Sequence, residues 1–145
     1  MHWKRRARSA RAVLGPALAI LIATGADALA DDTSRFPGFA EAERTPARSV
    51  ECGELRPILQ RLPDLDRRVD LWAAGKLVGV QTDGALWFLV ICALPDVRIL
   101  CVTYESNGMK VGDRVYLRGA YERKDDHHVL LDPCLASPAE EGAAQ

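Results

Sequence analysis

The strongest constraint on the fold is a series of short apolar segments, separated by turn residues, in the second half of the chain. Gly75 and Gly79 interrupt the first of these segments at positions that suit bulges or bends. Asp83-Gly84 predicts a two-residue hairpin turn after it. Five strands in so short a chain predict a mainly β fold, namely a small closed or nearly closed barrel. The five segments lie at 69–82, 85–92, 97–104, 113–121 and 128–133.

The second and fourth segments differ in their hydrophobic pattern. Residues 85–92 are apolar throughout, which predicts a strand that is buried on both faces or nearly so. The fourth segment alternates instead, and successive side chains of a strand point to opposite faces. It should therefore bury Val115 and Leu117 and expose the side chains between and beside them: Arg114, Tyr116 and Arg118. The last strand is expected to stop at Pro133.

The order of these segments resembles the OB-fold. The stretch MKVGDRVYLRGAY, which ends at Tyr121, is similar to the fourth strand of OB domains, where a Gly-Asp turn precedes alternating apolar residues and a glycine. The nearest group is the small exported OB-fold proteins of bacteria, and the resemblance spans residues 69–133. It implies a five-stranded OB-like barrel whose ligand face would involve the second and third strands and the loops at 81–85 and 122–128. Residues 105–110 are too short for the helix that many OB domains carry before the fourth strand. No functional residue of a named family carries over.

The residues before the barrel predict a short helix after an irregular segment. Four apolar residues have the spacing of one helical face: Leu55, Ile58, Leu59 and Leu62. Because Pro57 suits a first turn, the helix is expected over about 57–62. Residues 31–48 are polar and without a period, which predicts a flexible lead-in. A single OB-like barrel domain with an N-terminal helix should then occupy 49–136, followed by a disordered tail at 137–145.

The first 30 residues have the three parts of a signal peptide. Basic residues precede an apolar run at 12–23, and Ala28-Leu29-Ala30 supplies the small residues of a cleavage site. The apolar run is shorter than the roughly 20 residues that span a bilayer. We therefore expect residues 1–30 to be a signal peptide cleaved after Ala30, and the mature chain to be periplasmic or secreted, with no transmembrane segment. The general secretory and twin-arginine routes both stay open.

Removal of the signal peptide changes the charge balance. It takes away five of the 19 basic residues and one of the 20 acidic residues, and the remaining 115 residues carry a net charge of −5. A mildly acidic chain is a poor match for a phosphate backbone, so nucleic acid is not expected as a partner. The mature length suffices for one small domain with a single core.

An even number of cysteines in an exported domain predicts a disulfide framework. Spacing alone allows three pairings of the four cysteines. If residues 85–104 fold as a hairpin about Pro95-Asp96, Cys92 and Cys101 lie opposite each other, about 4.5–5.5 Å apart at Cα. Cys52 would then pair with Cys134. No C-x-x-C motif is present, so the cysteines predict neither metal binding nor redox catalysis.

The polar side of the fourth strand is the candidate ligand surface. Trp87 lies within an apolar run and is expected in the core, whereas Trp72 is as consistent with a stacking face as with the core. Tyr104 is compatible with either place. The residues to which we assign ligand binding are Arg114, Tyr116, Arg118, Tyr121 and Trp72.

Residues that could act in catalysis or bind a metal are otherwise scarce. His127 and His128 are adjacent on a strand or loop, so their rings point to opposite faces and do not easily share one metal ion. The sequence holds no recognisable nucleophile motif, paired carboxylates or phosphate-binding loop. Asp113, Arg114 and Arg118 come nearest to a catalytic set, but Asp113 more simply makes the turn into the fourth strand. We therefore expect no enzyme activity, no cofactor and no metal.

Two functions remain for the chain. The first is an exported, disulfide-stabilised binding or accessory module that holds a protein, peptide or glycan partner on its barrel face. The alternative is a small exported hydrolase or nuclease on the same barrel, which would need carboxylates and arginines together in a concave site.

Overall fold

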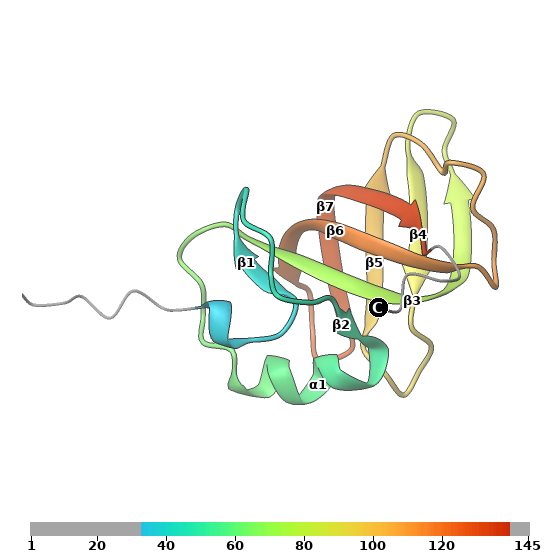
Figure 1. Ribbon diagram of the computed structural model, residues 1–145. Coiled ribbons are helices and arrows are strands. Elements are labelled where there is room, and N and C mark those ends of the chain that lie inside the picture. Colours follow the sequence, from blue (N-terminus) through green and yellow to red (C-terminus); the bar gives the residue numbers. More distant parts are fainter. Residues whose placement is uncertain (1–32, 140–145) are drawn as a thin grey trace, which may run out of the picture.

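The computed structural model describes residues 33–139 and forms a small β-barrel with one α-helix packed at its end (Figure 1). The signal peptide expected at 1–30 and the residues 140–145 of the expected tail lie outside the described residues. Within 33–139, no helix has the length and apolar composition needed to cross a membrane. In chain order the elements are η1 (Thr33–Arg35), β1 (Phe39–Glu41), β2 (Val50–Glu51), α1 (Cys52–Arg61), β3 (Val69–Thr82), β4 (Trp87–Ile91), β5 (Arg98–Thr103), β6 (Arg114–Arg123) and β7 (His128–Pro138).

Five strands close the barrel in the order β3-β4-β5-β7-β6, and β6 returns to pair with β3. The pairing of β5 with β7 is parallel, whereas the other four pairings are antiparallel. This is a five-stranded Greek-key barrel of the OB type. The predicted fold class, a mainly β OB-like barrel preceded by one short helix, is confirmed. The residues between β5 and β6 form turns and no helix, as their length predicted.

The core lies inside the barrel and is built from alternate residues of each strand. On β6, Val115 and Leu117 are 0% and 1% exposed, and the side chains between them point outward. This confirms the predicted orientation of the fourth strand. Leu55, Ile58 and Leu59 of α1 close one end of the core, so the predicted apolar face of the helix is confirmed as well.

Helix α1 begins at Cys52, earlier than the expected start at Pro57. The Glu54 carboxylate accepts the backbone N–H of Glu51 at 2.9 Å, which satisfies a donor that the first turn leaves free. Pro57 therefore lies inside the helix rather than in its first turn. This early start of the helix fixes Glu51 at the edge of the barrel.

Within residues 33–48, where the sequence predicted a flexible lead-in, η1 and β1 are regular elements and residues 42–48 form turns and irregular chain. Strand β1 pairs antiparallel with β3, and Phe39 is only 1% exposed. Phe36 is also buried. Burial of two aromatic rings offsets the entropy lost when the segment is ordered. Strand β2 then runs parallel to β3 and leads directly into α1.

The turn between β3 and β4 differs from its predicted form. The β3–β4 connection spans residues 83–86 rather than Asp83-Gly84 alone, because Thr82 pairs with Trp87. Asp83 closes it, since its Oδ1 accepts the backbone N–H groups of Ala85 and Leu86. These hydrogen bonds lower the pKa of the Asp83 carboxyl.

Strand β7 continues beyond Pro133, where it was expected to stop. The β6–β7 register shifts between Gly119 and Tyr121, so Pro133 lies in an irregularity of the ladder. A bulge tolerates proline because no ladder hydrogen bond is required there. The strand resumes and pairs with β6 as far as Pro138. This extension places Leu135 and Ser137 beside the candidate ligand residues.

Strand β4 is buried on one face only. Leu89 and Ile91 are completely buried inside the barrel, whereas Phe88 and Val90 point outward and are half-buried. The expectation that this strand is buried on both faces is wrong for its outer side. An apolar run therefore did not distinguish a doubly covered strand from one with an apolar outer face.

The predicted disulfide pairing is wrong, although two disulfides are present as expected. Cys52 is bonded to Cys92, and Cys101 to Cys134, each pair with Cα atoms 5.4 Å apart. The error lies in the hairpin register. Leu89 pairs with Cys101 and Ile91 with Ile99, so β4 ends before Cys92.

The residues 92–97 form a longer loop than the expected turn at Pro95-Asp96. Cys92 has a φ of 69°, which takes its side chain out of the β4–β5 ladder and toward the start of α1. Cys101 instead points into the core, where it meets Cys134 beyond the end of the β5–β7 ladder. The two bridges close loops of 40 and 33 residues, each worth about 4 kcal/mol on the chain-entropy model.

Candidate ligand groove

The outer faces of β3, β6 and β7 place their outward residues in two straight rows. In the first row, Arg118 of β6 lies between Trp72 of β3 and Leu135 of β7. In the second row, Tyr116 is paired with Ala74 on one side and Ser137 on the other. Residues directly opposite on antiparallel strands are close enough for their side chains to interact. Ala74 is buried, and the other members of the two rows form one continuous surface.

The segment before α1 turns this surface into a groove of about 920 Å³. Its wall consists of the residues that lead into and form β2. Tyr116 and Leu135 are 40% and 60% exposed, so large apolar groups remain open to solvent on the floor. We call this feature the outer groove. It is lined by Ala47, Arg48, Ser49, Glu51, Trp72, Tyr116, Leu117, Arg118, Leu135, Ala136 and Ser137.

Trp72 and Arg118 lie where the outer groove meets a second hollow of about 260 Å³. The Arg118 guanidinium carbon is 4.9 Å from the centre of the Trp72 ring, a cation–π contact. The indole Nε1–H of Trp72 is buried and has no hydrogen-bond acceptor among the described residues. Buried polar groups are nearly always hydrogen-bonded, so this donor is unusual.

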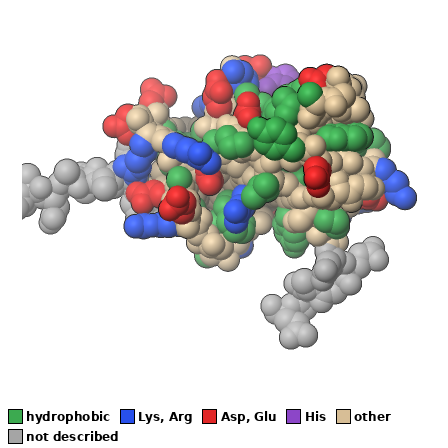
Figure 2. Space-filling model, turned by 90° about the horizontal axis from the view of Figure 1, so that it is seen from above, with side chains coloured by type: hydrophobic (Ala, Val, Ile, Leu, Met, Phe, Trp, Pro, Cys, Tyr) green, Lys and Arg blue, Asp and Glu red, His purple; other side chains and the backbone are tan. Residues whose placement is uncertain are grey.

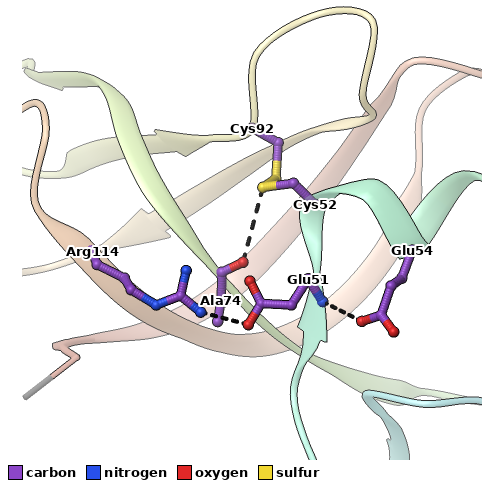
Figure 3. The surroundings of a disulfide bond; sticks show 6 residues. All are labelled: Glu51, Cys52, Glu54, Ala74, Cys92 and Arg114. Atoms are coloured by element: carbon purple, nitrogen blue, oxygen red, sulfur yellow. Dashed lines mark hydrogen bonds and ion pairs between the residues drawn. A yellow bond between two sulfur atoms is a disulfide. The ribbon is translucent and has the colours of Figure 1, made fainter. Parts of the chain in front are cut away.

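The arginines at the wall of the groove are held by carboxylates. Arg114 Nη2 lies 2.5 Å from Glu51 Oε1, and Arg48 forms a two-pronged pair with Glu54 at 2.7 and 2.8 Å. The Arg48 hydrogen bond, followed by the Glu51 backbone N–H, lowers the pKa of the Glu54 carboxyl. Figure 3 shows Glu51 between Arg114 and Glu54.

The Cys52–Cys92 disulfide anchors this wall to the barrel. It bonds the first residue of α1 to the β4–β5 loop, and Cys52 Sγ lies 3.9 Å from the Ala74 carbonyl oxygen of β3 (Figure 3). Gly75 leaves room for the approach, because a Cβ there would be 2.7 Å from Cys52 Sγ. Glu51, the next residue toward the N-terminus, is therefore positioned by the disulfide and by its pairing with β3.

The structure brings three of the five predicted ligand residues together. Trp72, Tyr116 and Arg118 line the outer groove, whereas Arg114 is paired with Glu51 and does not line it. Tyr121 is elsewhere. It pairs with Leu131 on the core side of the sheet, and its ring packs edge-on against Phe39 at 5.1 Å. Burial raises the pKa of the Tyr121 hydroxyl to about 12.

Sequence reasoning missed the wall of the groove and Leu135. Leu135 was placed after the expected end of the last strand at Pro133. Residues 47–51 were divided between the lead-in and the start of the domain. The burial of Cys134 and Ala136 on either side shows that Leu135 points outward, but the apolar run Cys134-Leu135-Ala136 carries no such signal in the sequence. No local signal marks residues 47–51 as a wall for a strand that lies far along the chain.

The other residues that could act in catalysis or bind a metal stabilise loops instead. Asp113 Oδ2 accepts the backbone N–H of Lys110 at 2.9 Å, which confirms its predicted role in the turn before β6. Asp125 accepts the backbone N–H of His127 and contacts Nδ1 of His128, and these hydrogen bonds lower the pKa of its carboxyl. Within residues 33–139, no group of three potential metal ligands lies together.

The two histidines have different neighbours. His127 Nδ1 lies 3.3 Å from Arg56 of α1, and Arg56 also donates to the backbone oxygens of Pro95 and Asp126. Arg56 thus joins the helix to the β4–β5 and β6–β7 loops. Asp113, Arg114 and Arg118, the nearest approach to a catalytic set, bind three different partners and form no shared site.

Comparison of the chain with family models finds no match, and comparison with curated proteins finds none. Among solved structures, the chain is similar to one in the crystal structure of the S. pombe Stn1-ten1 complex, at 12% identity and a TM-score of 0.33. The match covers 49% of this chain and 59% of that one. A likeness this small carries no functional argument, so function is argued from the groove alone.

Proposed function

We propose that this protein is an exported, disulfide-stabilised binding module that holds a protein, peptide or glycan partner in the outer groove. The observation that carries the proposal is the floor of the groove, where Tyr116 and Leu135 are exposed next to Trp72 and Arg118. Aromatic and arginine side chains dominate the energetics of binding surfaces. The groove is concave and lies on regular strands, which hold these side chains in a fixed arrangement.

Two disulfides support the exported part of the proposal. Structural disulfides persist in oxidising compartments and are rare in the cytosol. A small domain with a limited core also gains most from such cross-links. The periplasm or the extracellular medium is therefore the proposed location, as the N-terminal sequence also predicts.

We propose no catalytic role for the groove. A hydrolase or nuclease would need a general base or a metal site beside its arginines. The acidic residue at the groove, Glu51, is already paired with Arg114 at 2.5 Å. Assays of the mature protein for phosphodiesterase and glycosidase activity test this point, and turnover that survives repurification and depends on Glu51 would contradict it.

The binding proposal is tested by affinity capture from periplasmic extract with matched variants. The groove variant carries Tyr116→Ala, Arg118→Ala and Leu135→Ala. The control variant removes the same three residue types from exposed positions elsewhere: Tyr104→Ala, Arg98→Ala and Leu94→Ala. A partner that the wild type and the control retain, and that the groove variant loses, supports the proposal. Equal retention by all three proteins contradicts it.

A further inference from the structure

Arg118 differs from the other arginines around the outer groove because it has no carboxylate partner. Arg114 and Arg48 are each paired with a glutamate. Arg118 is exposed, and its guanidinium lies over the Trp72 ring. Glu43 and Asp70 line the neighbouring hollow, but neither lies within ion-pair distance of Arg118, and Arg68 binds Asp70 at 3.2 Å. Among residues 33–139, its guanidinium therefore has unused donors.

The stacking contact prepares Arg118 to bind an anion. A guanidinium presents its donors in a rigid planar fork that matches a carboxylate. Contact with the Trp72 ring, 4.9 Å from the guanidinium carbon, restricts the motion of this fork. The indole N–H of Trp72 also lacks an acceptor, but its nitrogen is buried, so the exposed donors at this place are those of Arg118. A carboxylate ligand would satisfy guanidinium donors that the protein leaves unpaired.

The same contact argues against a neutral glycan. A sugar ring that binds by stacking needs an uncovered aromatic face, and Arg118 occupies a face of Trp72. The neighbours of Arg118 along the floor are apolar: Leu135 lies opposite it, and Tyr116 is the next outward residue on β6. The floor thus combines one free cationic fork with adjoining apolar surface.

We propose that Arg118, held on Trp72, is a carboxylate-binding subsite, and that the occupant of the outer groove is a peptide segment with an acidic residue between apolar residues. The acidic side chain would bind the Arg118 fork, and its apolar neighbours would cover Leu135 and Tyr116. This inference rests on the proposed function and narrows it from three partner classes to one.

The test is a nuclear magnetic resonance titration of the mature protein with two small peptides. One is acetyl-leucyl-glutamyl-leucine amide, and the other has glutamine in place of glutamate and is otherwise identical. The indole N–H resonance of Trp72, assigned with Trp72→Phe, reports directly on the subsite. Backbone amides of β6 and β7 report on the adjoining apolar floor.

The acidic peptide should shift the Trp72 resonance with saturation, and the neutral peptide should bind at least tenfold more weakly. Arg118→Gln should remove this preference. Arg118→Lys should keep only part of it, because lysine has the charge but not the planar fork. The control is Arg98→Gln, an exposed arginine of β5, which should bind both peptides as the wild type does.

Equal binding of the two peptides, or unchanged preference in Arg118→Gln, would overturn the carboxylate subsite. So would the absence of saturable binding by either peptide, or saturation of the Trp72 resonance by a neutral oligosaccharide alone. These failures are distinct from failure of the proposed function. In each case, partner capture that depends on the groove would leave a binding module with a different ligand.

Discussion

The outer surface of the barrel has two faces of contrasting chemistry. On β3, β6 and β7, the outward rows mix Trp72, Tyr116 and Leu135 with arginines, and the segment before α1 rises beside them. On β4, β5 and the first part of β7, most outward side chains are apolar and half-buried, and the polar outward residues, Arg98 and His128, lie at one edge of this face. The apolar side chains are Phe88, Val90, Leu100, Val102 and Leu130.

The two faces differ in how well they could recognise a ligand. The five apolar side chains of the second face supply contact area but no hydrogen-bonding groups to orient a ligand. The outer groove combines apolar area with oriented donors, and its walls limit which ligands fit. Figure 2 shows hydrophobic side chains in patches along the molecule, with charged side chains most numerous at one end and others along its edges. An exposed apolar side chain is therefore a poor guide to the site on this protein without the groove geometry.

The largest expected loss of stability follows from removal of the disulfide between β5 and β7. Replacement of Cys101 and Cys134 by alanine should lower the free energy of unfolding by about 4 kcal/mol, because a 33-residue loop is released in the unfolded chain. Urea unfolding measures the loss. Non-reducing peptide mapping of the wild type should show Cys52–Cys92 and Cys101–Cys134, and a Cys92–Cys101 peptide would contradict the observed register.

The second expected effect distinguishes the two sides of β6. Leu117→Ala should cost about 2–5 kcal/mol because it leaves a cavity in the core. Its neighbours Tyr116 and Arg118 point outward, and alanine at either position should change stability by within about 0.5 kcal/mol. Chemical denaturation of the three variants checks this. A greater loss from Arg118→Ala than from Leu117→Ala would mean that the strand is inverted.

A smaller loss of stability is expected from a substitution on the apolar face. Phe88 is half-buried and paired with Val102, so Phe88→Ala should cost about 1–2 kcal/mol, between the values for core and groove positions. It should leave partner capture unchanged, since it lies outside the groove. Loss of capture without loss of stability in this variant would move the binding surface to the apolar face.

The smallest expected effect is the stability that the Arg48–Glu54 pair contributes at the wall of the groove, and this contribution depends on pH. The pKa of Glu54 is lowered by Arg48, so the pair stabilises the fold above the ordinary carboxyl pKa of about 4.3. That contribution is lost as pH falls through the lowered folded pKa. The stability difference between wild type and Glu54→Gln should therefore be greatest near neutral pH and vanish at low pH. Urea unfolding between about pH 2 and 7 measures it, and a difference that grows on acidification has the wrong sign.

Local pattern predicted the barrel strands well, and register was the main source of error. The alternation at 114–118 fixed which side chains face the core, because a one-residue shift would bury arginines. The same alternation places Tyr121 with Val115 and Leu117 on the inner side, which the sequence prediction overlooked. Cysteine pairing depended on the length of the 92–97 loop, which composition does not determine.

The groove itself could be predicted only in part. Its floor on β6 follows from the alternating pattern, and Trp72 was a candidate for a ligand face. The wall formed by residues 47–51 depends on β2 pairing with β3 and on the Cys52–Cys92 bond. Both are long-range contacts with no period or motif in the sequence. The unpaired state of Arg118 is likewise visible only once every nearby carboxylate has a position.

The most direct test of the central claim is hydrogen exchange of the protein alone and with its captured partner. If the outer groove is the binding surface, amides at 47–51, 114–118 and 135–137 should exchange more slowly in the complex, whereas those at 87–91 and 98–103 should not change. Protection confined to β4 and β5, with the groove unaffected, would contradict the account.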